Sequence, residues 1–485
     1  MAIRFGTSGW RAVIADEFTF QNVRAVTEAI CGYLKTEGAN VGTKLIVGHD
    51  TRFMGEAFAD VAADIAARRG FHVLKCSHPV PTPTMSHAIR SLKAAGALNF
   101  TASHNPPEYQ GIKFSTADGA PALPEVTKKI EERIEAVSGQ RSVVSEETRP
   151  GDGQAEKGSQ ADSGDAKGSI EELDPRDAYL EDLKTKIRFD VIAGAKGTYG
   201  YDPLWGTGRG YLNKVLQDAG LDVETIHDWR DVTFGGQAPE PGEEHIGELK
   251  QLVIDKKYTL GLATDGDADR FGVIDAGGKF ITPNELIALL TDYLCETRPD
   301  PRGVARSVAT TMMVDRVAKA RGIELYETPV GFKFIGELIN EDKIVLGGEE
   351  SAGLSIRGHY PEKDGILACL LAAEAVAARG TSLTEQLNEL YRKVGKLESG
   401  RIGVKLTLDV ADKLKDKLAQ EPGDIAGRTV EKIDRIDGVK FLFGNDTWML
   451  MRPSGTEPLV RIYAEAEDKK TVDELLEDGR KYLLG

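Results

Sequence analysis

A strand–helix–strand rhythm recurs along this chain and constrains its fold more than any other feature of the sequence. In its first occurrence, short apolar runs predict strands at 44–48, 71–76 and 97–101, and amphipathic stretches predict helices at 56–69 and 85–95. Strands separated by helices favour a largely parallel sheet that is covered by helices. The sequence therefore predicts an α/β fold.

The rhythm returns twice further along the chain. A less regular copy is expected to have a strand at 197–201, a helix at 211–219 and a strand at 259–263. A later copy is expected to alternate strands and helices over five short segments: 307–310, 313–321, 323–327, 334–340 and 344–346. Three copies of one pattern predict three related α/β domains with mixed, largely parallel sheets.

Two stretches depart from this rhythm. Residues 138–172 are rich in Gly and Ser, contain no aromatic residue and carry more acids than bases, which is typical of a flexible linker or surface excursion. After residue 394, strands are expected at 401–406, 439–443 and 447–451, followed by an amphipathic helix at 471–484. This order predicts a smaller C-terminal domain of α+β type.

The length of the chain agrees with several domains, since 485 residues are enough for three or more at roughly 150 residues each. We expect four domains and one linker. Their predicted bounds are 1–137, 173–281 and 282–393 for the α/β domains, 394–485 for the α+β domain and 138–172 for the linker.

The composition excludes several kinds of protein. A formal net charge of −16 argues against a protein that coats nucleic acid or an anionic membrane, so an anionic ligand would need a local basic pocket. The four cysteines are too scattered for a metal or redox pair, and we expect buried free thiols. We see no apolar signal core at the amino terminus, and the apolar stretch 366–378 is too short to span a bilayer. A cytoplasmic location follows as an expectation.

Three unusual polar patches follow predicted strands, one in each repeated module. They are residues 101–107, 265–270 and 347–353. In open α/β sheets, ligands bind beyond the carboxyl ends of strands, where backbone groups and helix amino termini gather. Equivalent placement in three modules predicts one shared active site.

The second patch has the character of a cation site. Asp265, Asp267 and Asp269 alternate with small residues and would bring three carboxylates around one point, which suits a hard divalent cation. A calcium EF-hand loop is excluded, because its sixth position would be Arg270 and its twelfth Ala276. The pattern favours metal binding over an acidic surface turn.

Other sequence motifs narrow the chemistry. The chain contains neither the Gly-x-Ser-x-Gly elbow of serine hydrolases nor the phosphate loop of nucleoside triphosphatases. Ser103 lies in a His-Asn-Pro-Pro turn, where a hydroxyl often only stabilises the turn. Residues 452–458 combine a guanidinium, two hydroxyls and a glycine, which suits a phosphate group but also occurs in ordinary loops.

Taken together, these motifs resemble those of the α-D-phosphohexomutase superfamily, which comprises phosphoglucomutases, phosphomannomutases and phosphoglucosamine mutases. The resemblance covers nearly the whole chain outside the linker. It depends on six separated motifs in the family's order: 7–11, 101–107, 111–113, 265–270, 348–353 and 452–458. It implies three related α/β domains and a fourth α+β domain around a central cleft.

The resemblance also implies roles for individual residues. Ser103 would be the phosphoserine, with a phosphate oxygen completing a site for one Mg²⁺ formed by Asp265, Asp267 and Asp269. Lys113 would be the general acid or base, with His104 beside it, and Arg11 and Arg270 would steady the phosphoryl group. The expected substrate contacts are Glu349, Ser351 and Gly331 near the sugar, and Arg452, Ser454, Gly455 and Thr456 on the distal phosphate. Lys333 and Lys363 are expected as additional cations of the cleft, with an ordinary surface lysine as the alternative for each.

The implied reaction interconverts glucose 1-phosphate and glucose 6-phosphate, with glucose 1,6-bisphosphate as intermediate and activator. The Glu-Glu-Ser-Ala sugar loop and residues 331–334 are more similar to the phosphoglucomutase branch than to the Met-Ser-Gly-His or Gln-Ser-Gly-His loops of mannose and glucosamine relatives. Position 353 is Gly where those relatives carry His. Phosphomannomutase or dual activity is the alternative. A metal-dependent sugar phosphatase and a sugar-phosphate-binding protein without turnover are more distant ones. We expect a hexose phosphate as the ligand, neither nucleic acid nor membrane as a partner, and a monomer or small homo-oligomer.

Overall fold

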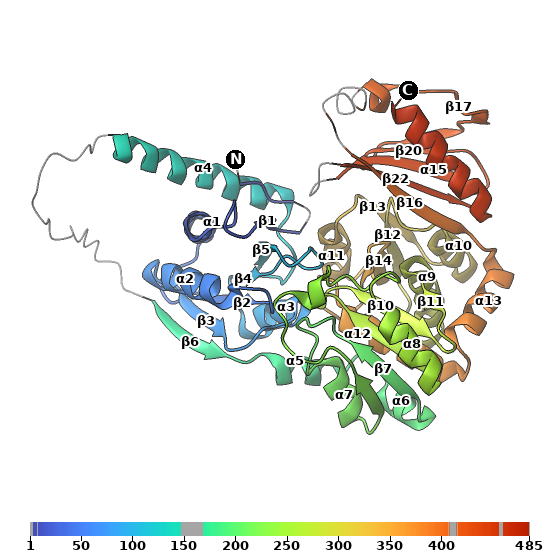
Figure 1. Cartoon of the computed structure of the whole chain (residues 1–485), viewed down its shortest axis with the longest axis horizontal. Helices are drawn as coiled ribbons and strands as arrows, with labels where there is room; N and C mark the ends of the chain where they lie inside the picture. Colours follow the sequence, from blue (N-terminus) through green and yellow to red (C-terminus); the bar gives the residue numbers. More distant parts are fainter. Residues whose placement is uncertain are drawn as a thin grey trace, which may run out of the picture.

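In the computed structural model, the described residues are 3–6, 8–146, 168–405, 407, 414, 416–454 and 459–484, with side chains not described for 137–146. They form four domains, each built on one sheet (Figure 1). Three sheets mix parallel and antiparallel strands and carry helices, and the fourth is antiparallel. The predicted α/β class with a different C-terminal domain is confirmed.

The first domain has a six-stranded sheet in the order β1-β5-β4-β2-β3-β6. Side chains alternate between its faces, so Leu45 and Val47 pack under one set of helices while Ile46 packs against α3. The helices are α1 (Phe20–Thr36), α2 (Gly55–Arg68), α3 (Thr82–Leu92) and α4 (Pro124–Glu146). The strands are β1 (Trp10–Val13), β2 (Lys44–His49), β3 (His72–Cys76), β4 (Gly96–Phe100), β5 (Tyr109–Thr116) and β6 (Ser169–Leu173).

The stretch predicted as a linker is partly regular structure. Residues 138–146 continue α4, and β6 pairs in parallel with β3 through residues 169–173. Strand β6 escaped prediction because its backbone makes the pairing while its side chains are mostly exposed, so the composition of the segment contains no sign of burial. Residues 147–167 lie outside the described residues.

The second and third domains share one continuous apolar core. Their sheets have the orders β11-β10-β9-β7-β8 and β13-β12-β14-β15. The strands are β7 (Thr198–Asp202), β8 (Asp222–Thr225), β9 (Leu260–Thr264), β10 (Phe271–Asp275), β11 (Phe280–Ile281), β12 (Gly303–Ser307), β13 (Leu325–Thr328), β14 (Ile344–Glu349) and β15 (Gly353–Ile356). The helices are α5 (Arg176–Leu183), α6 (Phe189–Ala195), α7 (Leu212–Asp218), α8 (Gly247–Lys256), α9 (Pro283–Thr297), α10 (Met313–Arg321), α11 (Phe332–Asn340), α12 (Gly365–Arg379) and α13 (Leu383–Val394), and a short 3₁₀ helix η1 spans Phe234–Gly236.

One predicted strand of the third domain was wrong in position. The strand expected at 307–310 is β12, which ends at Ser307, and residues 308–310 form the turn that follows. The apolar pattern of β12 is interrupted by Arg306, whose guanidinium is buried and paired with Asp315 and Glu327. A buried, paired charge interrupts the run of apolar residues by which a buried strand is predicted from sequence.

The fourth domain has the antiparallel sheet order β16-β22-β21-β20-β19 and one long helix. Its elements are β16 (Glu398–Lys405), β19 (Lys432–Asp434), β20 (Val439–Leu442), β21 (Trp448–Pro453), β22 (Leu459–Ala466) and α15 (Lys469–Leu484), with a small hairpin of β17 (Asp424–Ile425) and β18 (Arg428–Thr429). It has its own core, and a smaller cluster around Val308 and Trp448 joins it to the third domain.

Three equivalent turns bring the sequence motifs together. In each α/β sheet a central strand ends and the chain returns antiparallel beside it, from β4 to β5, from β9 to β10 and from β14 to β15. Residues 101–108, 265–270 and 350–352 occupy these turns. In the described part of the chain no single helix is long and apolar enough to cross a membrane, although α12 and α13 pass that test together as a pair bent by 80°.

Candidate active site

Ser103, the predicted phosphoserine, lies in the turn between β4 and β5 and is buried. Its Oγ donates a 2.7 Å hydrogen bond to Oδ2 of Asp265 in the second domain, and its backbone N–H donates to Oγ1 of Thr101 at 2.9 Å. Its φ of 53° lies in the left-handed region, which residues other than glycine rarely adopt. The surrounding contacts must therefore hold the serine in place.

The three predicted metal ligands, Asp265, Asp267 and Asp269, form a buried cluster in the turn between β9 and β10. Each contributes a carboxylate oxygen, and these oxygens lie within 4.8 Å of one another. Burial and the charges of Asp267 and Asp269 raise the pKa of Asp265 well above its usual value. Such crowding of carboxylates without solvent requires compensating positive charge.

The cluster also offers oxygens to a cation. Oδ1 of Asp267 and Oδ1 of Asp269 are buried and accept no hydrogen bond, whereas Oδ2 of Asp267 accepts one from the hydroxyl of Thr82. Buried acceptors without a donor are costly, and hard cations such as Mg²⁺ prefer carboxylate oxygens. The three aspartates therefore fit the predicted magnesium site.

Lys113 contacts the same carboxylates from β5. Its Nζ lies 2.6 Å from Oδ2 of Asp267 and 2.6 Å from Oδ2 of Asp269. Burial lowers the pKa of Lys113, but the two carboxylates outweigh burial and leave the pKa above its usual value. Lys113 is therefore an ammonium group in contact with two of the aspartates, and it is not among the described residues that line the cleft in front of Ser103.

Three further predicted residues surround Ser103. Nδ1 of His104 lies 3.3 Å from Oγ of Ser103, and Nη1 of Arg11 donates to Oδ1 of Asn105 at 2.7 Å. Burial, with the nearby charges of Arg270 and Arg11, lowers the pKa of His104 well below its usual value. Burial and the Arg270 charge also lower the pKa of Arg11 to about 10. His104 is therefore neutral at neutral pH, while Arg11 stays charged.

The third domain contributes the predicted sugar loop. Oε1 of Glu349, at the end of β14, accepts a 2.7 Å hydrogen bond from the backbone N–H of Gly331. Burial and the neighbouring Glu350 raise the pKa of Glu349 to about 7. Ser351 lines the cleft with these residues. Lys333 is buried in the first turn of α11, and it does not belong to the described cleft lining.

Lys363 does line the cleft, and Gly353 makes room for it. Its Nζ donates to Oδ2 of Asp269 at 2.9 Å and to Oε1 of Glu362 at 3.1 Å. A Cβ atom on Gly353 would lie 2.2 Å from Cδ of Lys363. Any larger residue at position 353 would therefore displace the lysine stem from its present position.

The fourth domain forms the remaining wall. Arg452 and Ser454 line the cleft, and Nε of Arg452 donates to Oδ2 of Asp437 at 2.7 Å. Arg461 and Tyr463 of β22 lie beside them. Gly455 and Thr456, predicted as phosphate contacts, lie outside the described residues.

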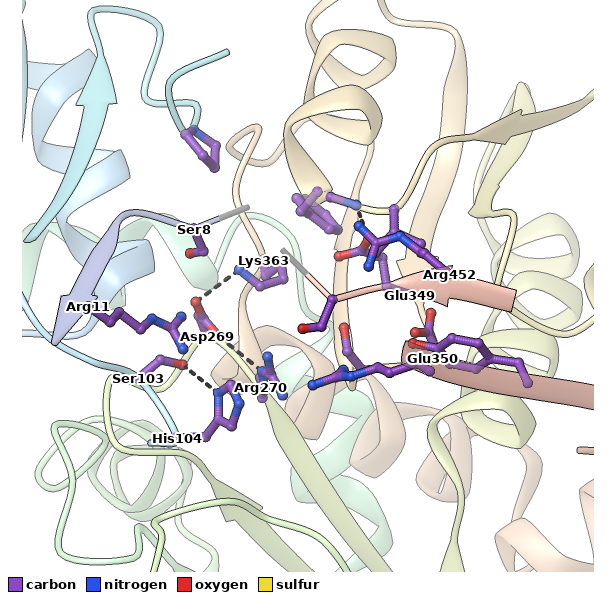
Figure 2. Close-up of a pocket in the computed structure, with 18 residues that line it drawn as sticks. Ser8, Arg11, Ser103, His104, Asp269, Arg270, Glu349, Glu350, Lys363 and Arg452 are labelled. Atoms are coloured by element: carbon purple, nitrogen blue, oxygen red, sulfur yellow. Dashed lines mark hydrogen bonds and ion pairs between the residues drawn. The ribbon is translucent and has the colours of Figure 1, made fainter. Parts of the chain in front are cut away.

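These side chains surround one cleft with walls from all four domains (Figure 2). It holds roughly 810 Å³ of space, including its opening to solvent. In Figure 2, Arg11, Ser103, Asp269 and Arg270 gather on one side, and Glu349, Glu350 and Arg452 lie across from them. The cleft therefore presents a hydroxyl above a cation site at one end and a guanidinium at the other.

Some residues of the site escaped prediction. Arg461 and Tyr463 line the cleft without a motif that marks them, and Ser8 lines it from within the motif 7–11, where no role was predicted for it. Arg52 is fully buried beneath the serine loop, to whose carbonyls it donates, and the polar run 50–52 follows β2 directly. The rule that points to the carboxyl ends of strands would have identified this run, since β2 lies beside β4.

Comparison with known families gives the same four-part division. Models described as phosphoglucomutase/phosphomannomutase match in order along the chain. Alpha/beta/alpha domains I, II and III match residues 2–141, 177–278 and 282–394, and the C-terminal domain matches residues 405–481.

Individual relatives match over nearly their whole length. A crystal structure from Thermus thermophilus, described as a candidate phosphomannomutase, is 36% identical with a TM-score of 0.83, and all of both chains is covered. A Thermococcus kodakarensis phosphoglucomutase/phosphomannomutase is 29% identical over 99% of this chain and 98% of its own. A Methanothermobacter thermautotrophicus protein named probable phosphoglucosamine mutase is 30% identical over 99% of this chain and 97% of its own.

The fold and the cleft define a phosphohexomutase, an enzyme that moves a phosphoryl group between positions of a sugar. The chain belongs to the phosphoglucomutase/phosphomannomutase family of the α-D-phosphohexomutase superfamily. The family resemblance predicted from the sequence motifs is confirmed.

Proposed function

We propose that this enzyme interconverts glucose 1-phosphate and glucose 6-phosphate through a phosphoserine at Ser103. The observation that carries the proposal is the 2.7 Å hydrogen bond from Oγ of Ser103 to Asp265, inside a buried group of three carboxylates. A hydroxyl beside three buried carboxylates is suited to carry a phosphoryl group next to a cation.

Asp265, Asp267 and Asp269 would hold Mg²⁺, together with an oxygen of the phosphoryl group on Ser103. When bound, the cation would neutralise the negative charge that spreads over the phosphoryl oxygens during transfer. The chain's own cations, Arg11 and Arg270, line the cleft beside Ser103 and steady the same group.

In the first half-reaction, the bond between phosphorus and Oγ of Ser103 breaks and a bond from phosphorus to the free sugar hydroxyl oxygen forms. The sugar hydroxyl proton passes to His104, a neutral base that lines the cleft beside Ser103. Lys113, held as an ammonium by two carboxylates, supplies a proton to the serine oxygen. The second half-reaction reverses these transfers with the other phosphate of glucose 1,6-bisphosphate.

The opposite wall holds the part of the substrate that does not react. Glu349 and Ser351 bind sugar hydroxyls, and Arg452 and Ser454 bind the distal phosphate, with Gly455 and Thr456 next in the chain. The bisphosphate must turn between the half-reactions, which favours contacts drawn from separate domains over one rigid pocket. Lys333 is buried in the first turn of α11 and is not among the described residues that line the cleft, so we assign it a supporting place.

Glucose specificity is favoured by the contact between Gly353 and Lys363. The lysine stem occupies the space that a histidine at position 353 would need, so the cleft has an ammonium at that wall instead of an imidazole. Phosphomannomutase or dual activity is the alternative, favoured by the 36% identity to the Thermus structure. The relative named as a phosphoglucosamine mutase makes glucosamine phosphate a third substrate to measure.

The experiment compares rates with glucose, mannose, glucosamine and N-acetylglucosamine 1-phosphates, each with Mg²⁺ and a catalytic amount of its 1,6-bisphosphate. We expect isomerisation to the 6-phosphate, fastest with glucose and lost in Ser103→Ala. A metal-dependent phosphatase would instead release inorganic phosphate in step with substrate loss. Failure to isomerise any of the four sugars would contradict the proposal.

A further inference from the structure

Arg52 is a buried arginine whose side chain is fully saturated with hydrogen bonds. It is 0% exposed, and each of its five N–H groups has an acceptor. Nε donates to Oδ2 of Asp50 at 3.1 Å. The other four N–H groups donate to backbone carbonyls of one short loop: Ser103 at 2.7 Å, Asn105 at 2.6 Å, Pro106 at 2.8 Å and Tyr109 at 3.1 Å.

The guanidinium is itself held on its remaining sides. The backbone N–H of Arg52 donates to Oδ1 of Asp50 at 2.9 Å, and the backbone N–H of Asp50 donates to the carbonyl of Phe100 at 2.9 Å. The ring of Phe234, from the second domain, lies 4.9 Å from the centre of the guanidinium. Arg52 is therefore fixed to the end of β4 and to the neighbouring domain.

The loop that Arg52 holds is the one that needs support. Ser103 has a φ of 53°, in the left-handed region. Its carbonyl is close to the metal loop as well, because a Cβ atom on Gly266 would lie 2.6 Å from that oxygen. The Ser103 carbonyl is thus held by Arg52 and packed against Gly266, so a small rotation of the loop would change the direction of the serine Oγ.

We propose that Arg52 is a positioning residue that sets the conformation of the Ser103 loop and thereby the rate of phosphoryl transfer at Ser103. The inference deepens the proposed function and rests on it. A planar fork with five donors can hold four carbonyls and a carboxylate at once, whereas a lysine has three donors on one nitrogen. The shape of the guanidinium, more than its charge, holds the loop.

The test separates shape from charge. Arg52→Lys keeps the positive charge beside Asp50 but loses most of the carbonyl contacts. Four proteins are compared in separate reactions: wild type, Ser103→Ala, Arg52→Lys and Arg298→Lys. Each is first dephosphorylated and then incubated with glucose 1,6-bisphosphate and Mg²⁺, and the gain of one phosphoryl group is followed by intact mass. Arg298 is the matched control, since it pairs with the buried Glu374 and donates to the carbonyl of Lys186.

We expect Arg52→Lys to take up the phosphoryl group ~100-fold more slowly than wild type, the loss typical of a reacting group displaced by about 1 Å. The bisphosphate concentration for half-maximal rate should stay unchanged, because the substrate contacts are intact. Arg298→Lys should match wild type. The rate of phosphoryl uptake is divided by the folded fraction of each variant, which circular dichroism measures at a temperature below the unfolding transition. A variant that has only lost stability would therefore show the wild-type rate.

A second variant covers the case in which Arg52→Lys does not fold. Thr101→Val keeps Arg52 but removes the hydroxyl that accepts the Ser103 N–H, and we expect transfer about tenfold slower, the worth of one hydrogen bond. A wild-type rate in folded Arg52→Lys, or in Thr101→Val, overturns the positioning role alone. If wild type itself gains no phosphoryl group at Ser103, the proposed function fails and the inference falls with it.

Discussion

Oγ of Ser103 and Oδ2 of Asp265 are 2.7 Å apart although 162 positions separate them in the chain. They lie in turns at the carboxyl ends of β4 and β9, in two different domains. The reacting end of the cleft is therefore an interface between domains. A change in how the two turns pack should alter catalysis without touching a substrate contact.

Gly266→Ala tests that packing directly. A Cβ atom there would lie 2.6 Å from the Ser103 carbonyl oxygen and 3.1 Å from Cγ of Pro239, so the two turns must move apart. We expect kcat to fall ~100-fold, with little change in the circular dichroism spectrum. Gly247→Ala, in the same domain, is the control, because nothing lies within 4 Å of its Cβ position. Equal activity of the two variants would refute the effect of packing.

Removal of magnesium should affect both activity and stability. Because a ligand that binds the folded state stabilises it, Mg²⁺ should raise the melting temperature of wild type in a concentration-dependent way. Oδ1 of Asp267 is buried and accepts no hydrogen bond, so it is available to the cation. Asp267→Asn removes this carboxylate and should abolish both the magnesium-dependent rise in melting temperature and the activity. Asp218→Asn, on the exposed face of α7, should keep both. A full magnesium response in Asp267→Asn would argue against the site.

Glu349 should make stability depend on pH. Its pKa is raised from 4.5 to about 7 by burial and by Glu350, so the folded state binds its proton more tightly than the unfolded state does. The destabilisation is absent below the unfolded pKa of about 4.5, grows as the pH rises, and is complete above about 7. The shift is worth about 3 kcal/mol.

Glu349→Gln removes this titration but keeps an oxygen for the Gly331 N–H. The variant should gain stability relative to wild type as the pH rises from 5 to 8, by an amount of that order. Thermal melts at several pH values measure the difference. A difference independent of pH would show that Glu349 titrates normally.

Arg452 should affect binding more than turnover. In the proposed function it contacts the phosphate that does not react, so its interaction would be the same in ground and transition states and its loss should raise KM. We expect Arg452→Ala to raise KM by ~10- to 100-fold, the worth of a charge-assisted hydrogen bond pair, with a smaller change in kcat. Arg480→Ala removes an arginine from the exposed face of α15 and serves as the control. A fall in kcat at constant KM would place Arg452 at the reacting end instead.

Much of this arrangement could be predicted from local sequence. Strand β2 (Lys44–His49) was expected at 44–48, and the motif turns were expected at the ends of the strands where they occur. Helix α3 was expected at 85–95 but spans Thr82–Leu92, since Pro83 suits its first turn and Lys93, with a φ of 54°, ends it. Apolar periodicity identifies an element well and its ends poorly.

The parts that escaped prediction depend on contacts between distant segments. Arg52 reads as one more charged residue after a strand, and its importance comes from carbonyls more than 50 positions away. Strand β6 joins the edge of the sheet through backbone pairing with β3, and its side chains are mostly exposed. Its sequence therefore has almost no apolar pattern. The need for a glycine at position 353 becomes apparent only in the folded structure, where the side chain of Lys363 fills the space beside it. Tertiary contacts of this kind leave little trace in composition or periodicity.

The most direct test follows the phosphoryl group itself. The dephosphorylated enzyme is incubated with Mg²⁺ and glucose 1,6-bisphosphate, its intact mass is measured, and glucose 1-phosphate is then supplied. We expect one phosphoryl group on wild type and none on Ser103→Ala, and conversion to glucose 6-phosphate by the phosphorylated form alone, without release of inorganic phosphate. Conversion by Ser103→Ala at the wild-type rate would contradict a phosphoserine mechanism at this cleft.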